Sequence, residues 1–218
     1  MCIRDSRKKM IYEGERRMES RPGGTKTVGG KEFYTGAKPK NGHKDATNLF
    51  DGCQVQTSGT SCGLLPGVLL QRLGVNKNPK TTAITQYVTS STTDGMEGLG
   101  TQFGAWVSSN GKNRPQPGDI YVMYNRDNTA FEHVGVVHSV AEKTWETMDS
   151  GQGRGMMDSC VKATKYIMSP EERTKAGLPL GIYHQPYGST PDTGGPNARI
   201  VRGWVDIDKL MAYVNSAK

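Results

Sequence analysis

Cys62 is the residue with the clearest potential for chemistry, because it lies between small polar residues and a leucine-rich run in TSCGLLPGVLLQRLG, residues 60–74. A cysteine thiolate is a strong nucleophile, and placement at a helix start lowers the thiol pKa from its free value of about 8.5. The partial positive charge of a helix start acts within the first turn. The alternative is an inert thiol buried beside the leucines. We interpret Cys62 as a nucleophile.

A nucleophilic cysteine needs a base, and FEHVGVVHSV (residues 131–140) offers two histidines. Alternate residues of a strand face opposite sides, so His133 and His138 point away from each other. His138 shares its face with valines, whereas Gly135 leaves room on the face of His133. His133 is therefore the candidate base, and His138 is interpreted as structural.

The base needs a third residue that orients its ring, and Asp149 at the end of KTWETMD is the candidate. A hairpin turning over residues 140–142 would pair position 137 with 145, 135 with 147 and 133 with 149. Opposed residues share a face, so Asp149 would then lie beside His133. A one-residue slip would break this arrangement. Gln152 is the alternative if the turn is longer, and Asp149 is otherwise a loop-opening residue.

The segment that carries Cys62 has the spacing of an amphipathic helix over residues 60–73. Its apolar stripe comprises Leu64, Leu65, Val68, Leu69 and Leu73. Pro66 is compatible with a helix that begins near Ser61, because the first turn lacks intrahelical N–H partners. Gly74 is expected to end the helix.

Strands are expected after this helix. In RPQPGDIYVMY a Pro- and Gly-rich turn precedes a strand from Ile120, and Asp119 is interpreted as a carboxylate that stabilises this turn. Two further strands follow over residues 131–140 and 143–149. RIVRGWVDIDKLMAYV then predicts a strand and a helix that begins near Asp206. A helix followed by mainly antiparallel strands predicts the α+β class.

The net charge of +7 lies mostly near the N-terminus, because residues 1–52 contain 12 Lys and Arg against 7 Asp and Glu. We interpret residues 1–50 as a basic, flexible segment and residues 51–218 as one domain, which carries the candidate cysteine, histidine and aspartate and has a C-terminal strand–helix extension. The alternative for the basic segment is an electrostatic tether to an anionic polymer.

The first six residues, MCIRDS, resemble a translated sequencing adaptor, so the true N-terminus is expected to be missing.

Several partner classes are not expected. The chain contains no nucleic-acid-binding motif and no apolar run near the roughly 20 residues of a membrane-spanning helix. It has four cysteines without a C-x-x-C spacing, and its four histidines are not spaced as zinc ligands. We therefore expect no cofactor, no metal, no nucleic-acid partner and no membrane span.

Three motifs in one order carry a family resemblance: TSCG at a helix start, then PQPGDIYVM, then EHVGVVHSV. Together they resemble the CHAP and NlpC/P60 cysteine hydrolases over about residues 58–150. The resemblance implies a papain-like core, with a helix bearing Cys62 packed on an antiparallel sheet. It also implies that Cys62 is the nucleophile, His133 the base and Asp149 the third residue.

The resemblance is incomplete in two respects. The third residue is usually Glu or Asn in CHAP domains, whereas the candidate here is Asp149. The segments GQGRG and RGWVDIDKL also lie outside the general pattern of the family. Gln56 stands six residues before Cys62, the spacing of the oxyanion-hole glutamine in papain-like proteases. Ser61, Gln56 and Gln152 are therefore candidate oxyanion or substrate contacts. The backbone N–H of Cys62 is a further oxyanion donor.

The expected function is amide hydrolysis through a thioester. The resemblance implies that the substrate is peptidoglycan, cut as an N-acetylmuramoyl-L-alanine amidase or a peptide endopeptidase, so a bacterial or phage protein acting on the cell wall is expected. One alternative is the same core acting as an interbacterial toxin, as a phage lysin or on a non-wall amide or ester. The alternative from another class is an inactive wall-binding module.

Overall fold

The computed structural model describes residues 3–19, 25–28, 31–34, 61–75, 95–110, 113–125, 128–142, 144–150, 160–167, 171, 174, 182–184 and 199–216. Within these ranges the chain forms helices and one antiparallel sheet, so the predicted α+β class is confirmed. No helix in these ranges has the length and apolar character needed to cross a bilayer.

The strands pair in the order β1-β2-β7-β6-β5-β4-β9-β3. Their bounds are β1 Thr25–Val28, β2 Lys31–Tyr34, β3 Trp106–Ser108, β4 Ile120–Asn125, β5 Phe131–Val140, β6 Thr144–Ser150, β7 Cys160–Ile167, β8 Ile182–His184 and β9 Arg199–Val205. The short strand β8 pairs with both β7 and β9. The pairings β4-β5-β6-β7-β8-β9 therefore close into a ring, which gives this part of the sheet an inner and an outer side.

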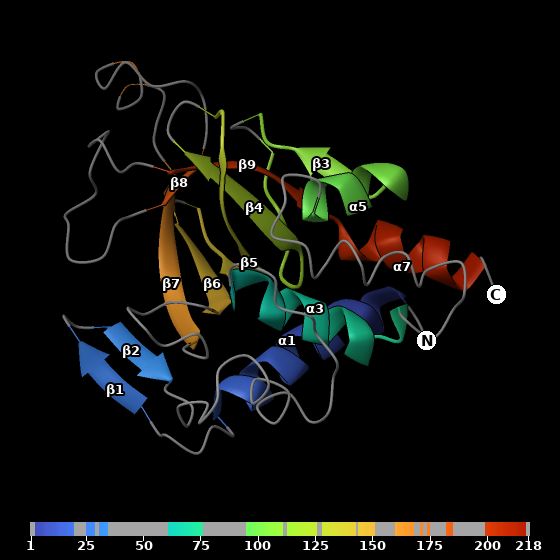
Figure 1. Cartoon of the computed structure of the whole chain (residues 1–218), viewed down its shortest axis with the longest axis horizontal. Helices are drawn as coiled ribbons and strands as arrows, with labels where there is room; N and C mark the ends of the chain where they lie inside the picture. The colour runs from blue at the N-terminus through green and yellow to red at the C-terminus, as the bar shows by residue number, and fades with distance from the viewer. Residues whose placement is uncertain are drawn as a thin grey trace.

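The helices lie outside this ring (Figure 1). They are α1 Ile3–Glu19, the 3₁₀ turn η2 Ser61–Gly63, α3 Leu64–Arg72, α5 Met96–Gln102 and α7 Ile207–Ser216. Helix α1 packs against α3 and α7, α3 packs against β5 and β6, and α5 packs against β3 and β9. The turn η2 contacts β5 and β6, which places the predicted nucleophile next to the predicted base.

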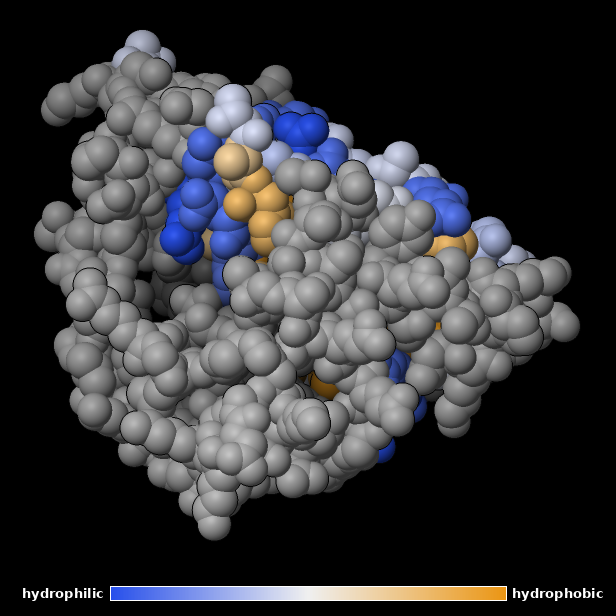
Figure 2. All heavy atoms as spheres, in the orientation of Figure 1, coloured by the Kyte–Doolittle hydropathy of each residue, from blue (hydrophilic) through white to orange (hydrophobic). Residues whose placement is uncertain are grey.

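Two separate apolar clusters result from strand alternation. The outer side of the strands packs with the helices in the larger cluster, which includes Leu65, Leu69, Val134, Met148 and Leu210. The inner side forms the smaller one, of Tyr121, Met123, Val137, Trp145, Val201 and Trp204. Among the described residues the exposed large apolar side chains are Tyr12 and Tyr213. On the face that Figure 2 shows, the described atoms are mostly hydrophilic, with a few hydrophobic areas.

The helix expected around residues 60–73 is confirmed, with a 3₁₀ first turn. Ser61–Gly63 form η2, which runs directly into α3. Pro66 lies in the first turn of α3, where its missing N–H costs no hydrogen bond. Gly74 follows the last turn with φ +83, and its N–H donates to the carbonyl of Gln71. This left-handed residue is the expected glycine stop.

Helix α1 was not expected from the sequence, which predicted a flexible basic segment there. The structure instead buries Met10 completely in the larger core cluster. Apolar residues are too sparse in this helix to signal a packed face, since its mean hydropathy is low. A charged residue of this helix, Arg7, also joins it to distant parts of the chain.

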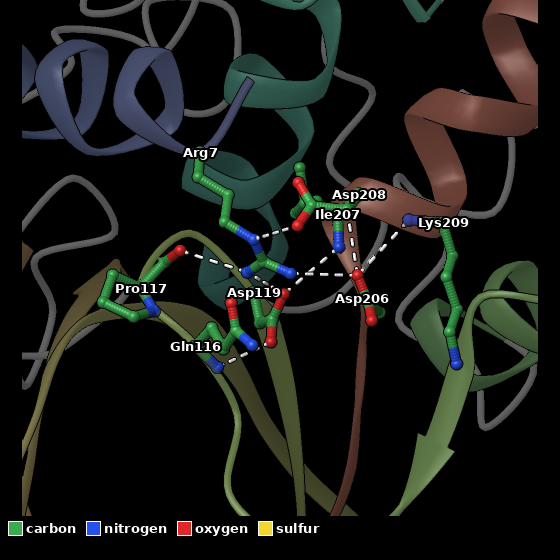
Figure 3. Close-up of polar contacts among 8 residues, drawn as sticks. All are labelled: Arg7, Gln116, Pro117, Asp119, Asp206, Ile207, Asp208 and Lys209. Carbon is green, nitrogen blue, oxygen red and sulfur yellow. Dashed lines mark hydrogen bonds and ion pairs between the residues drawn. The ribbon is translucent and has the colours of Figure 1, made fainter. Parts of the chain in front are cut away.

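Arg7 joins three parts of the fold (Figure 3). Its guanidinium donates to Asp119 at 2.6 Å, to Asp206 at 2.9 Å and to Asp208 at 2.6 Å. Asp119 precedes β4, and its carboxylate also accepts the backbone N–H groups of Gln116 and Ile207. The predicted turn-stabilising role of Asp119 is confirmed.

The two ends of this ion-pair network also fix their local backbones. Gly118 in the same turn has φ +93, and a Cβ there would lie 3.2 Å from the Cα of Arg7, so glycine lets α1 approach closely. Asp206 accepts the backbone N–H groups of Asp208 and Lys209, which caps α7 at the predicted position.

Replacing Arg7 with methionine is expected to lower the free energy of unfolding by about 3 kcal/mol, because it leaves a buried carboxylate unpaired. Burial raises the pKa of Asp119 to about 6, against the opposing effect of Arg7. A carboxyl group whose pKa is raised in the folded state lowers the free energy of unfolding as the pH rises toward that pKa. Loss of Arg7 raises the pKa of Asp119 further. The difference in free energy of unfolding between the variant and the wild type should therefore be larger at pH 8 than at pH 5.

Urea unfolding at both pH values measures this deficit. Lys8→Met is the control, since Lys8 is exposed on the same helix and the substitution removes the same charge. Equal small losses in the two variants would contradict the assigned role of Arg7.

Candidate active site

The β5–β6 hairpin carries the predicted base and its partner, in a register that differs from the predicted one. Val136 pairs with Met148 and Val137 with Thr147, whereas the predicted hairpin paired position 137 with 145. A bulge at His138 shifts the pairing to Ser139 with Glu146 nearer the turn. The predicted register is thus wrong by two residues beside the site. A shift of two preserves the face of every side chain, so His133 and Asp149 still share one.

His133 and Asp149 are in direct contact on this face. The His133 Nε2 atom lies 3.0 Å from Asp149 Oδ1, and the two side chains are 5% and 2% exposed. Gly135 lies two residues after His133 on β5 and pairs with Tyr121 of β4. A Cβ at Gly135 would overlap Asp149 Oδ1, so the carboxylate occupies the space that glycine leaves.

Cys62 completes a chain of three side chains. It is the middle residue of η2, it is 6% exposed, and its thiol and His133 are hydrogen-bonded to each other. Since Nε2 of the imidazole is used by Asp149, Nδ1 is the ring nitrogen left for the thiol. The 3₁₀ turn and α3 are continuous, so Cys62 stands at the start of the combined helical segment.

The protonation of His133 is set by these neighbours. Burial by itself lowers the pKa of His133, but hydrogen bonds from the imidazole to Asp149 and Cys62 outweigh it and raise the pKa above its ordinary value of 6.5. The protonated form of His133, beside the Asp149 carboxylate, is therefore favoured. A protonated imidazole beside a cysteine is the partner that stabilises a thiolate.

Two further side chains hold Asp149, and sequence reasoning missed both. The hydroxyl of Tyr121 on β4 donates to Oδ1, and the hydroxyl of Thr147 donates to Oδ2 at 2.6 Å. Burial and the nearby Asp149 charge raise the pKa of Tyr121 well above 10, which keeps the phenol protonated as a donor. Alternation on β6 places Thr147 on the face of Asp149, a signal that could have identified it.

The predicted oxyanion and substrate contacts lie outside what the structure describes. Gln56 and Gln152 lie outside the described residues, as does Cys53. Ser61 is the first residue of η2, and its side chain lies outside what is described. His138 contacts Glu15 of α1 at 2.7 Å and Glu146 at 3.3 Å. It thus links α1 to the hairpin, as expected of a structural residue.

The described residues contain no cluster of three or more His, Cys, Asp or Glu side chains arranged to hold a metal ion. Comparison of the chain with family models, with curated proteins and with solved structures gives no match. What the site does must therefore be inferred from its own geometry.

Proposed function

We propose that this protein is a cysteine hydrolase that cleaves amide bonds by acyl transfer, on a papain-like core of the CHAP or NlpC/P60 kind. The observation that supports it best is the buried hydrogen-bonded chain Cys62–His133–Asp149. Its three members come from η2, β5 and β6, and tertiary structure alone brings them together. A nucleophile, a base and a residue that orients the base are the parts this reaction requires.

In the acylation step the Cys62 thiolate attacks the carbonyl carbon of the scissile amide. A C–S bond forms, and the carbonyl π electrons move to the oxygen. When the tetrahedral intermediate collapses, the C–N bond breaks and the His133 imidazolium gives its proton to the departing nitrogen. The products are a free amine and a thioester on Cys62.

Deacylation returns the enzyme to its starting state. Neutral His133 takes a proton from a water molecule whose oxygen attacks the thioester carbon. The C–S bond then breaks, which releases a carboxylic acid, the Cys62 thiolate and an imidazolium. Throughout the cycle Asp149 fixes the ring orientation and stabilises its positive charge.

The substrate class we propose is peptidoglycan, cut either at the N-acetylmuramoyl-L-alanine amide or within the stem peptide. Its support is the order TSCG, PQPGDIYVM and EHVGVVHSV, whose described residues form η2, the turn before β4 with the start of β4, and most of β5. Action on the wall as a toxin or phage lysin, or on a non-wall amide or ester, uses the same three residues. An inactive wall-binding module is the rival from another class.

The deciding experiment incubates purified peptidoglycan with the wild type and with Cys62→Ala, followed by mass analysis of soluble fragments. We expect new amine and carboxyl ends from the wild type alone, and the fragment masses identify the bond. Pull-down of insoluble peptidoglycan separates the rival, which predicts binding by both proteins without fragments. Identical fragments from both proteins would overturn the mechanism.

A further inference from the structure

Tyr121 contacts the Asp149 end of the chain Cys62–His133–Asp149, and it takes no part in the proton transfers of the proposed reaction. It stands on β4 opposite Gly135, it is completely buried, and its hydroxyl donates to Asp149 Oδ1. That oxygen is also the acceptor for His133 Nε2. One carboxylate oxygen therefore receives two donors, while the other oxygen receives Thr147.

We propose that Tyr121 is a positioning residue that holds the Asp149 carboxylate in place and weakens the hydrogen bond between this carboxylate and His133. This inference rests on the proposed function of Cys62, His133 and Asp149. A donor on the shared oxygen withdraws negative charge from the bond to the imidazole. It thus keeps the imidazolium acidic enough to release its proton to a departing amine.

The environment of the phenol supports this role over simple packing. Around it lie His133 with ring centroids 6.2 Å apart, Trp145 in an edge contact at 6.5 Å, and Asp149. Replacing the phenol by a benzene ring would preserve both ring contacts. It would remove only the hydroxyl with its hydrogen bonds, so the hydroxyl can be tested separately from the ring.

Tyr121→Phe tests the proposal. With its second donor gone, Asp149 Oδ1 interacts more strongly with His133, so the imidazolium titrates at a higher pH. We expect the midpoint of His133 to rise by at least about half a pH unit, measured from the ring resonances in ¹H–¹⁵N spectra and assigned by comparison with a His133 variant. The same substitution is expected to lower kcat for amide hydrolysis by about tenfold, since proton delivery and ring position are both disturbed.

Tyr124→Phe is the matched control. Tyr124 lies three residues further along β4 and is buried, but its hydroxyl donates to Glu97 at 3.1 Å, away from the site. It should leave the midpoint of His133 unchanged. A Tyr121→Phe midpoint equal to the wild-type value, or below it, would overturn the proposal even if thermal stability fell.

The titration needs no substrate, so the inference can fail independently of the proposed function. If Tyr121→Phe raises the His133 midpoint as expected but the wild type cleaves no amide, the proposed hydrolase function is rejected and the effect of Tyr121 on His133 is retained. If cleavage depends on Cys62 but the His133 midpoint does not change in Tyr121→Phe, the role of Tyr121 is rejected and the proposed hydrolase function is retained.

Discussion

Replacing His133 with alanine is expected to reduce kcat/KM for amide cleavage by about a thousandfold. The imidazole supplies both proton transfers of the cycle, and general acid–base catalysis of this kind contributes roughly 10²–10⁴. His133 also contacts the Cys62 thiol, so the variant loses the cation that stabilises the thiolate. Initial rates on a soluble stem peptide, with circular dichroism to verify folding, measure the loss.

His138→Ala is the matched control, because His138 lies on the same strand but contacts Glu15 and Glu146. It should retain activity within a few-fold of the wild type. Equal losses in the two variants would show that both act through the stability of the hairpin, and would reject His133 as the base.

The pH profile of the wild type provides a second readout of the same residue. Because the pKa of His133 is raised, the acid form persists above pH 6.5 and is lost only at higher pH. The alkaline limb of kcat/KM should therefore lie above pH 6.5. A limb below this value would contradict the assigned hydrogen bonds.

The three residues of the candidate site could be predicted from the sequence because the signal for each of them is local. Helical spacing places Cys62 at a helix start, and strand alternation separates His133 from His138. The prediction that Asp149 shares a face with His133 survived an error in register, since the error was an even number of residues. An odd shift would have placed the carboxylate among the outer apolar residues.

Features that depend on tertiary contacts were not accessible in the same way. The bulge at His138 has no local sequence signal, and neither does the pairing of β8 with β7 and β9. Helix α1 depends on Arg7 meeting three aspartates from the β4 turn and α7, more than a hundred residues away in sequence. Charged contacts of this range leave no periodic pattern.

Gly135 shows both cases, because the space beside it could be predicted from the sequence but the groups that fill this space could not. From the sequence, Gly135 is expected only to leave room beside His133. In the structure that room is filled by Asp149 Oδ1 and by the Tyr121 hydroxyl. Both groups are buried, so neither can move into solvent without breaking the bonds that orient the imidazole.

Gly135→Ala is accordingly expected to reduce kcat/KM by about a hundredfold or more. Its Cβ would overlap the Asp149 carboxylate and lie 2.7 Å from the Tyr121 oxygen, so at least one must shift away from His133. Misplacement of catalytic groups by about 1 Å has effects of this size. Overpacking should also lower the free energy of unfolding by about 1–3 kcal/mol.

Gly104→Ala provides a control for the stability loss alone. Gly104 has φ +66 and no atom near its Cβ position, so alanine there is strained but lies outside the described site. It should lower stability with little change in kcat/KM. If Gly135→Ala retains wild-type activity, the carboxylate does not need its present position, and Asp149 is not the orienting residue.

The double variant Gly135→Ala/Tyr121→Phe distinguishes a shared cause from two separate ones. Both substitutions act through the Asp149 carboxylate, so their effects on kcat/KM should not multiply. Once alanine has displaced the carboxylate, loss of the phenol donor has little left to change. Fully multiplicative losses would mean that Tyr121 and Gly135 influence His133 by independent routes, and the common role of Asp149 would be rejected.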